Sequence, residues 1–402
     1  MIKKFIYPLL SNAFSSSDIR CGLKVLSSKH ITMSKITRNF EKKFAKRLGC
    51  KYALMTNSGS SANLLAVSAI INPMFKNKLK AGDEVLIPAV CWSTSLWPIV
   101  QNNLKPVFVD VELNTFNISI EDLKKRITSK TKAIMCVHVL GTSANLNQIK
   151  RIINKKNIIL IEDTCESLGA KFNNKFLGTF GEFGTFSFYY SHQITSGEGG
   201  MIVCNNIKNY NIIKSLRSHG WSRETTLHNI YKKKFKKLDD RFLFINSGFN
   251  LRPTDIQAAI GHSQFKRLNK FIITRNYNRK KIIDKIKKNR KWNNQFYFIN
   301  HLKQLKPSWF GLPILINKKY SNKKKEFLNH LTKCGVENRP ILSGNFTNQP
   351  ATKLYNLNSK KLTFVNAQKV EDLGFFIGLH TKKIPNKTAE YISECLLKIS
   401  EL

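Results

Sequence analysis

Residues 158–170 read IILIEDTCESLGA, a short apolar strand that ends in two carboxylates and a turn of small residues. Similar apolar runs occur on both sides of it, with helical patterns between them: EVLIPA (84–89), PVFVDV (106–111), AIMCVHV (133–139), GTFSFY (184–189) and GMIVC (200–204). This alternation predicts an α/β fold with a mostly parallel sheet covered by helices on both faces. Ligands of such sheets bind at the carboxyl ends of the strands.

The pattern changes beyond about residue 265. A long basic helical segment is followed by SWFGLPILI (308–316), a helical segment near 323–334 and a final helix near 388–400. We expect residues 1–265 to form an N-terminal segment and a large α/β domain, and residues 266–402 to form a smaller α+β domain.

The composition is that of a globular protein with an unusual charge. The 402 residues are 42% hydrophobic, and no apolar run is long enough to span a membrane. The short apolar stretch in MIKKFIYPLL also argues against a signal peptide, so we expect a cytoplasmic protein. A net charge of +42 raises the possibility of nucleic-acid binding. However, lysine is spread along the whole chain, and clusters such as KKKFKK (232–237) are more typical of solvated helix faces.

The cysteines favour reduced thiols over a disulfide framework or a metal site. They occur singly and include no CxxC pair: Cys21, Cys50, Cys91, Cys136, Cys165, Cys204, Cys334 and Cys395. An iron–sulfur cluster needs about four protein ligands, and the chain has no cysteine between Cys204 and Cys334. We predict no metal and no iron–sulfur cluster.

Three segments together indicate a pyridoxal phosphate site. In TNSGSSANLLAVSAI (56–70), Gly59, Ser60 and Ser61 stand where a helix begins, a position that can bind phosphate but also suits a simple serine cap. Asp163 ends an apolar strand, and a carboxylate there can pair with a protonated pyridine nitrogen. Trp92, in PAVCWSTS, is a candidate for stacking on the ring.

The order of motifs resembles the DegT/DnrJ/EryC1/StrS family of nucleotide-sugar aminotransferases, which have the fold-type I architecture of pyridoxal phosphate enzymes. The resemblance runs from about residue 5 to the C-terminus and is carried by four motifs: SGSSAN (58–63), EDTCESLGA (162–170), FSF with TSGEGGMI (186–202) and GFNLRPTDIQAAIG (248–261). It implies that the cofactor is held by Gly59, Ser60, Ser61, Trp92, Asp163, Glu166, Ser187 and Asn250. By the same resemblance, Asn250 reaches the phosphate from a second subunit, which implies a homodimer with shared active sites.

His192 is the departure from the family pattern. In the aminotransferases this position is the lysine that bonds to pyridoxal, and no lysine lies between Lys175 and Lys208. Without that amine, the usual entry to transamination is lost. The motif SFYYSHQITSGEGG (187–200) is similar to that of the 4-keto-6-deoxy-sugar 3-dehydratases, which have histidine here, and LSGNFTNQP (342–350) and SWFGLP (308–313) also resemble that branch.

The resemblance implies a reaction in which pyridoxamine phosphate, formed with L-glutamate, removes the C3 hydroxyl group of a nucleotide-linked sugar. Imidazole titrates near neutral pH, so His192 is the candidate catalytic acid and base. Within this branch, the CDP-linked enzymes carry a [2Fe-2S] cluster and the GDP-linked enzyme of the colitose pathway does not. The missing cysteines therefore favour the GDP-linked type, which serves surface-glycan synthesis, although the sequence leaves the nucleotide base open.

The sequence also offers candidates for substrate contacts. Arginine suits bidentate phosphate contacts, and the candidates for holding a diphosphate or sugar are Arg223, Arg252, Arg339 and Asn345. Each could equally have a structural role, and His138 is expected only to border the site. The alternative functions are an aminotransferase that uses an unrecognised lysine, a noncatalytic cofactor-binding regulator and a nucleic-acid binder, the last resting on charge alone.

Overall fold

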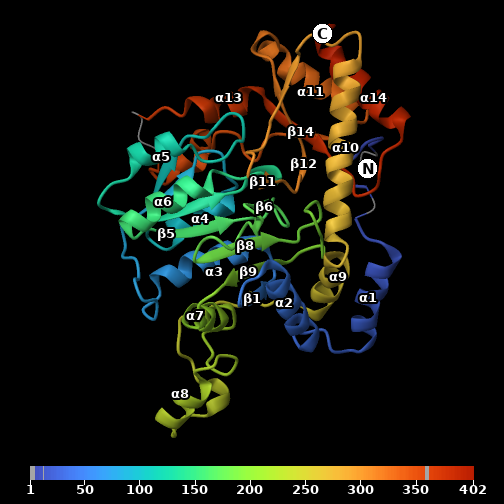
Figure 1. The fold of residues 1–402 in the computed structure, drawn as a ribbon. Coiled ribbons are helices and arrows are strands. Elements are labelled where there is room, and N and C mark those ends of the chain that lie inside the picture. The colour runs from blue at the N-terminus through green and yellow to red at the C-terminus, as the bar shows by residue number, and fades with distance from the viewer. Residues whose placement is uncertain (1–4, 12, 358–361) are drawn as a thin grey trace.

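The computed structural model describes residues 5–11, 13–357 and 362–402, and its centre is a seven-stranded sheet (Figure 1). The strands in spatial order are β1 (Tyr52–Thr56), β9 (Gly200–Cys204), β8 (Phe183–Ser187), β5 (Ile159–Asp163), β4 (Thr131–Val137), β2 (Glu84–Pro88) and β3 (Lys105–Val109). Only β9 runs antiparallel to its two neighbours, and the other pairs are parallel. The predicted α/β class with a mostly parallel sheet is therefore confirmed. Strand β1 was not anticipated from the sequence.

Helices cover both faces of this sheet because each strand is apolar on both sides. On one face, strand side chains such as Leu160 and Phe186 pack against α2 (Lys35–Leu48), α5 (Ile120–Arg126), α6 (Leu146–Lys156) and α9 (Asp255–Phe265). On the other face, Ile161 and Ile202 pack against α3 (Gly59–Ile71), α4 (Ser93–Gln101) and α7 (Ile207–Arg217). Successive residues of β5 therefore point toward different helices.

A smaller antiparallel sheet follows along the chain. Its strands in order are β10 (Phe296–Phe298), β12 (Gly311–Ile316), β14 (Gly374–Gly378) and β13 (Asn338–Arg339). Its helices are α10 (Leu268–Lys288), α11 (Lys324–Lys333), α12 (Pro350–Leu354), α13 (Val365–Leu373) and α14 (Asn386–Leu397). One hydrophobic core extends from the large sheet into this unit. The domain boundary at residue 265 stays a prediction.

The N-terminal segment connects the two units. Tyr7 pairs with Val336 beside β13, and its hydroxyl group donates to the carbonyl of Gly378 (3.0 Å). The chain then reaches α1 (Ser16–Ser27), which packs on α9 at the right-hand side of the molecule in Figure 1. The first described residues thus lie on the small sheet rather than on the large one.

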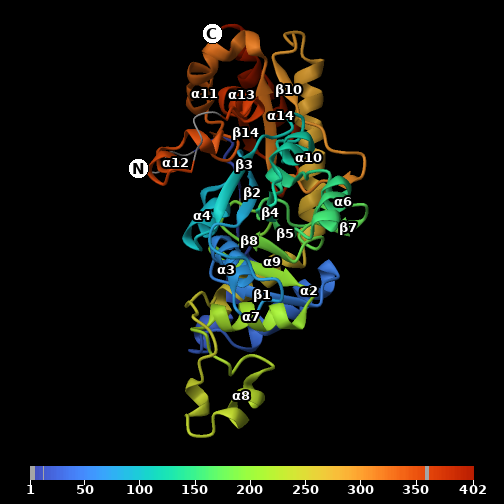
Figure 2. The ribbon, with the colours of Figure 1, turned by 90° about the vertical axis from the view of Figure 1, so that its left-hand side faces the viewer.

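Two peripheral elements complete the fold. A three-stranded ribbon joins β11 (Leu305–Lys306), β6 (Lys171–Phe172) and β7 (Lys175–Phe176). Helix α8 (His228–Lys234) projects away from the body of the molecule in both views (Figures 1 and 2). The lysines of the KKKFKK segment are exposed there, as expected of a solvated face. Among the described residues, no helix combines the length and apolarity needed to cross a membrane.

Contacts across the two units are close at Gly141, just beyond the end of β4. The Ser308 N–H donates to the Gly141 carbonyl (3.1 Å), and the Phe310 N–H donates to the Leu140 carbonyl (3.2 Å). A Cβ atom at Gly141 would lie 2.1 Å from the Ser308 carbonyl oxygen, and its φ of +93° also favours glycine. The segment before β12 is therefore held against the carboxyl edge of the large sheet.

Candidate active site

Asp163 is a buried carboxylate at the carboxyl end of β5. Its Oδ2 accepts hydrogen bonds from Asn63 Nδ2 of α3 (2.8 Å) and from the Ser95 hydroxyl of α4 (2.7 Å). Its Oδ1 accepts the Cys165 N–H (3.1 Å), which leaves that oxygen with further acceptor capacity. Two helices on one face of the sheet therefore orient the carboxylate. Sequence reasoning missed Asn63 and Ser95, although Asn63 is part of the SGSSAN motif.

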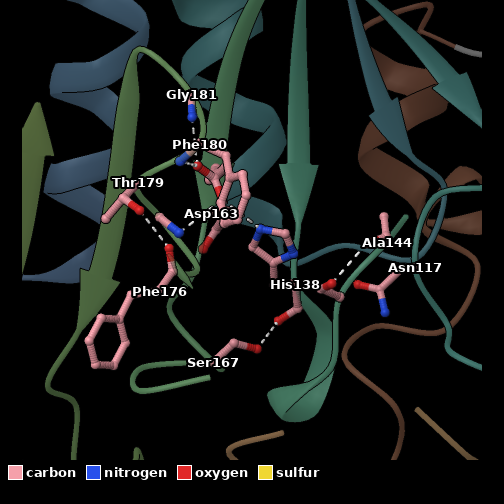
Figure 3. Close-up of polar contacts among 12 residues, drawn as sticks. Asn117, His138, Ala144, Asp163, Ser167, Phe176, Thr179, Phe180 and Gly181 are labelled. Carbon is pink, nitrogen blue, oxygen red and sulfur yellow. Dashed lines mark hydrogen bonds and ion pairs between the residues drawn. The ribbon is translucent and has the colours of Figure 1, made fainter. Parts of the chain in front are cut away.

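The preceding residue, Glu162, bonds to a different set of groups from Asp163, including those of His138, Phe180 and Gly181, which Figure 3 labels. Its fully buried carboxylate accepts three backbone N–H groups, those of Gly178 (2.8 Å), Phe180 (2.6 Å) and Gly181 (2.7 Å). His138 Nε2 lies 3.1 Å from Glu162 Oε1, and the His138 N–H donates to the Asp163 carbonyl (2.9 Å). His138, expected to border the site, is thus completely buried beside Glu162.

The residues proposed to bind phosphate converge at the N-terminus of α3. Ser58 caps the helix, because its hydroxyl accepts the Ser61 N–H (3.1 Å). A Cβ atom at Gly59 would lie 2.5 Å from Cβ of Ser187, so glycine allows the helix to begin directly beside the end of β8. Ser60 donates to the Thr94 hydroxyl (3.0 Å) at the start of α4. This helix terminus offers N–H groups, hydroxyls and a positive dipole end to an anion.

Trp92 stands at the N-cap of α4, three residues before Ser95, and its side chain is 53% exposed. A large exposed indole at the edge of a polar cluster is suited to stack on a flat ring. The LSGNFTNQP segment packs nearby, because the Ser343 hydroxyl donates to the Cys91 carbonyl (2.7 Å) and the Phe346 N–H donates to the Ala89 carbonyl (2.8 Å). Asn345 in this segment is buried, and its side chain accepts from Thr347.

His192 lies in the loop between β8 and β9 with a partly buried side chain. Its Nδ1 atom is buried and has no hydrogen-bond partner among the described residues. Burial lowers the pKa of His192 to about 4, Asp163 opposes this shift, and Arg275 adds to it. The imidazole is therefore neutral at physiological pH, so a ring nitrogen with a free lone pair can accept a proton.

Glu166 follows Asp163 by three residues and accepts the Leu140 N–H (2.9 Å). Burial raises the pKa of Glu166 to about 8, and the nearby Asp163 carboxylate contributes to the rise. Gln193, next to His192, donates to the carbonyls of Glu166 and Ser308. This side chain, which sequence reasoning also missed, links the His192 loop to the turn after β5.

The predicted substrate residues divide into two groups. Arg223 stacks on Trp221, with 3.6 Å from its guanidinium carbon to the ring centre, and Arg252 lies over the same ring at 5.5 Å. Arg252 also donates to the side chain of exposed Asn250 (3.0 Å). Arg339 is instead exposed and paired with Glu337 (3.0 Å) in the small unit.

The arrangement fits pyridoxal phosphate. A helix terminus suited to an anion, a buried carboxylate with spare acceptor capacity and an exposed indole lie near the ends of β5 and β8. The unpartnered Nδ1 of His192 is suited to accept a proton there. The Cys165 thiol beside Asp163 stays protonated, because burial raises its pKa well above the usual value. Among the described residues, no cluster of His, Cys, Asp and Glu side chains is arranged to hold a metal ion.

Comparison with known proteins gives consistent matches over nearly the whole chain. Residues 15–396 match the DegT/DnrJ/EryC1/StrS aminotransferase family. The chain is 38% identical to the GDP-4-keto-6-deoxy-D-mannose 3-dehydratase of Escherichia coli O55:H7, over 97% of this chain and 99% of that protein.

Two solved structures are also similar. That of the E. coli GDP-4-keto-6-deoxy-D-mannose-3-dehydratase with bound hydrated PLP has a TM-score of 0.90 and 38% identity, over 98% of this chain and 100% of that one. A structure of GDP-4-keto-6-deoxymannose-3-dehydratase with a trapped PLP-glutamate geminal diamine has a TM-score of 0.89 and 38% identity, over 97% and 100% of the two chains.

The raised pKa of Glu166 predicts a pH effect on stability. The folded chain keeps this carboxyl group protonated up to about pH 8, whereas an unperturbed glutamate ionises near pH 4.5. The contribution of Glu166 to stability therefore falls as pH rises through this window. Glu166→Gln removes the titration and keeps an acceptor for Leu140. We expect the free energy of unfolding of wild type minus that of the variant to fall between these pH values and then level off.

Urea unfolding of the cofactor-free protein at a series of pH values measures this difference, because all other titrating groups are common to both proteins. A difference that stays constant across the window would mean that Glu166 is ionised in the folded state at neutral pH.

Proposed function

Because this chain belongs to the DegT/DnrJ/EryC1/StrS aminotransferase family, we propose that it is a pyridoxal phosphate-dependent sugar 3-dehydratase. Its substrate is a nucleotide-linked 4-keto-6-deoxyhexose, which loses the C3 hydroxyl group, and L-glutamate is the amino donor. The observation that carries this proposal is His192, a neutral imidazole with a free nitrogen at the position of the family's lysine. The relatives named as 3-dehydratases support it.

Different residues of the chain would bind different parts of the cofactor. The N-terminus of α3, with Gly59, Ser60, Ser61 and Ser187, binds the phosphate. Asp163 would pair with the ring nitrogen, and its bonds from Asn63 and Ser95 hold its carboxylate in a fixed orientation. Trp92 would stack on the ring. When bound, the cofactor supplies an electron sink for breaking bonds at the sugar.

His192 takes up and returns protons without bonding to the cofactor. At neutral pH its imidazole begins uncharged, so its unpartnered Nδ1 could take the proton that carbon loses in the elimination and pass it to the C3 hydroxyl group, which would then leave as water. Asp163 stabilises the imidazolium that forms, since its carboxylate favours the charged state. A lysine at this position would instead form a covalent bond.

The proposed assembly is a cytoplasmic homodimer with shared sites. Asn250 is exposed, and its neighbour Leu251 accepts the Asn57 N–H (3.1 Å) beside the α3 terminus, so this segment lies at the outer edge of the phosphate site. From there it can reach a second subunit. Arg223 and Arg252, gathered around Trp221, form a cationic surface suited to a diphosphate. The GDP-linked sugar follows the named relatives, and a role in surface-glycan synthesis follows the resemblance found in the sequence.

The product identifies the reaction. Purified protein is incubated with pyridoxal phosphate, L-glutamate and GDP-4-keto-6-deoxymannose, and ammonia, 2-oxoglutarate and sugar mass are followed together. We expect loss of the C3 oxygen with release of ammonia. His192→Asn should lower the rate by about a hundredfold or more, in keeping with the loss of a general base. His301→Asn changes an exposed histidine outside the site and should have no effect.

An amino sugar as the product would contradict the proposal and identify an aminotransferase. If only the CDP-linked sugar is converted, the proposed dehydratase reaction stands and the proposed GDP-linked substrate is wrong.

Shared sites are tested by mixing two inactive variants. In a hybrid dimer of His192→Asn and Asn250→Asp subunits, one site contains both changes and the other contains neither, if Asn250 serves the partner's site. Unfolding and refolding the equimolar mixture should therefore restore about a quarter of the wild-type activity, since about half of the dimers are hybrids with one intact site each. Mixtures that stay inactive, while each variant still forms dimers, would show that Asn250 acts within its own subunit.

A further inference from the structure

Arg275, in the first half of α10, is a buried arginine close to the candidate active site. Its side chain is 2% exposed, and its guanidinium group donates to three carbonyl oxygens. Nε bonds to Leu379 (3.0 Å), Nη1 to Trp309 (3.5 Å) and Nη2 to His192 (3.3 Å). These acceptors belong to three separate segments: the end of β14, the approach to β12 and the catalytic loop after β8.

The charge of Arg275 is not neutralised by an acid. Among the described residues, no carboxylate forms an ion pair with this guanidinium. Burial lowers the pKa of Arg275 to about 10, so it remains a cation at neutral pH. The adjacent Tyr7 is a neutral phenol, because burial raises its pKa well above the usual value. A buried cation is costly unless its donors are satisfied, and only arginine directs donors from one plane toward several acceptors.

We propose that Arg275 is a positioning residue for the reaction of His192: it fixes the catalytic loop against β12 and β14 and opposes protonation of the imidazole. This role rests on the proposed function. The bond to the His192 carbonyl sets the backbone of the loop, and Phe310, one residue beyond Trp309, packs edge-on against the imidazole with 5.1 Å between ring centres. One side chain thus holds both the histidine and the ring that borders it.

The groups that face the imidazole act in opposite directions. Asp163 and a hydrogen bond with the Cys165 backbone favour the charged ring, whereas burial and the Arg275 cation disfavour it. The rings of Tyr189 and Phe310 pack edge-on against the imidazole. Removing the Arg275 charge leaves burial as the effect that still opposes Asp163, so the pKa of His192 should rise. A purely structural arginine would not have this effect.

Arg279 provides a matched control one helical turn further along α10. Arg279 is partly buried and, like Arg275, has no carboxylate partner among the described residues. It donates to the Ile299 carbonyl (2.6 Å), and its guanidinium carbon lies 4.2 Å from the ring centre of Trp309. Burial lowers its pKa to about 10, as for Arg275, but it is not among the charges that act on His192.

The test is a ¹⁵N-histidine NMR titration of the cofactor-free protein, with the His192 signal assigned by its loss in His192→Asn. In wild type we expect this ring to stay neutral where an ordinary histidine titrates, near pH 6.5. Arg275→Gln should move the titration midpoint upward, whereas Arg275→Lys and Arg279→Gln should leave it in place. Under the proposed assay, Arg275→Gln and Arg275→Lys should each lose about tenfold or more in kcat, and Arg279→Gln should retain it.

An unchanged midpoint in Arg275→Gln, or an equal shift in Arg279→Gln, would overturn the proposal. If Arg275→Gln does not fold, Arg275→Lys provides the test. A His192 titration midpoint equal to that of wild type, together with a lowered kcat, supports the positioning role of Arg275, and a wild-type kcat overturns it. Because the titration needs no substrate, a shifted midpoint without dehydratase activity would reject the proposed function and keep the link between Arg275 and His192.

Discussion

A carboxylate can stay buried only when its oxygens are hydrogen-bonded, and this constraint at Asp163 organises the whole site. Its bonds to Asn63 and Ser95 fix α3 and α4 relative to the end of β5. The same two helices begin at Gly59 and next to Trp92, so the same carboxylate sets the positions of the helix terminus that we propose to bind phosphate and of the ring that we propose to stack on the cofactor. Glu162, on the opposite face, accepts hydrogen bonds from three backbone N–H groups and so fixes the end of β5.

Histidine changes what such a site can do. A lysine would bond to the cofactor covalently and be displaced by an incoming amine, whereas the role that we propose for His192 is limited to moving protons. The surroundings suit that limited role, because burial and Arg275 keep the imidazole neutral until a proton is delivered to it. A cofactor held only by noncovalent contacts depends more heavily on Asp163, on the α3 terminus and on the second subunit that we propose to contribute Asn250.

The fold and the motif-borne residues could be predicted because their signals are local. Apolar runs separated by helical segments identify the parallel strands, and Asp163 and His192 stand within motifs whose order is specific. The supporting contacts are not local: Ser95 lies 68 residues from Asp163, Asn63 lies 100 residues away, and Arg275 lies 83 residues from His192. A lone arginine in a basic helix carries no sequence signal that distinguishes it from the exposed lysines around it. Strand β1 (YALMT) was also missed, although it is as long as β2 and β5.

The central claim is that no lysine of this chain bonds to the cofactor. Sodium borohydride reduction of the pyridoxal phosphate-loaded protein, followed by peptide mass spectrometry, tests it directly, because reduction makes any bond between pyridoxal and a lysine permanent. We predict that the cofactor washes away from the reduced wild-type protein, and that a His192→Lys variant retains it on residue 192. A pyridoxyl group attached stoichiometrically to any lysine of the wild-type active site would contradict the claim and would support the alternative function of an aminotransferase.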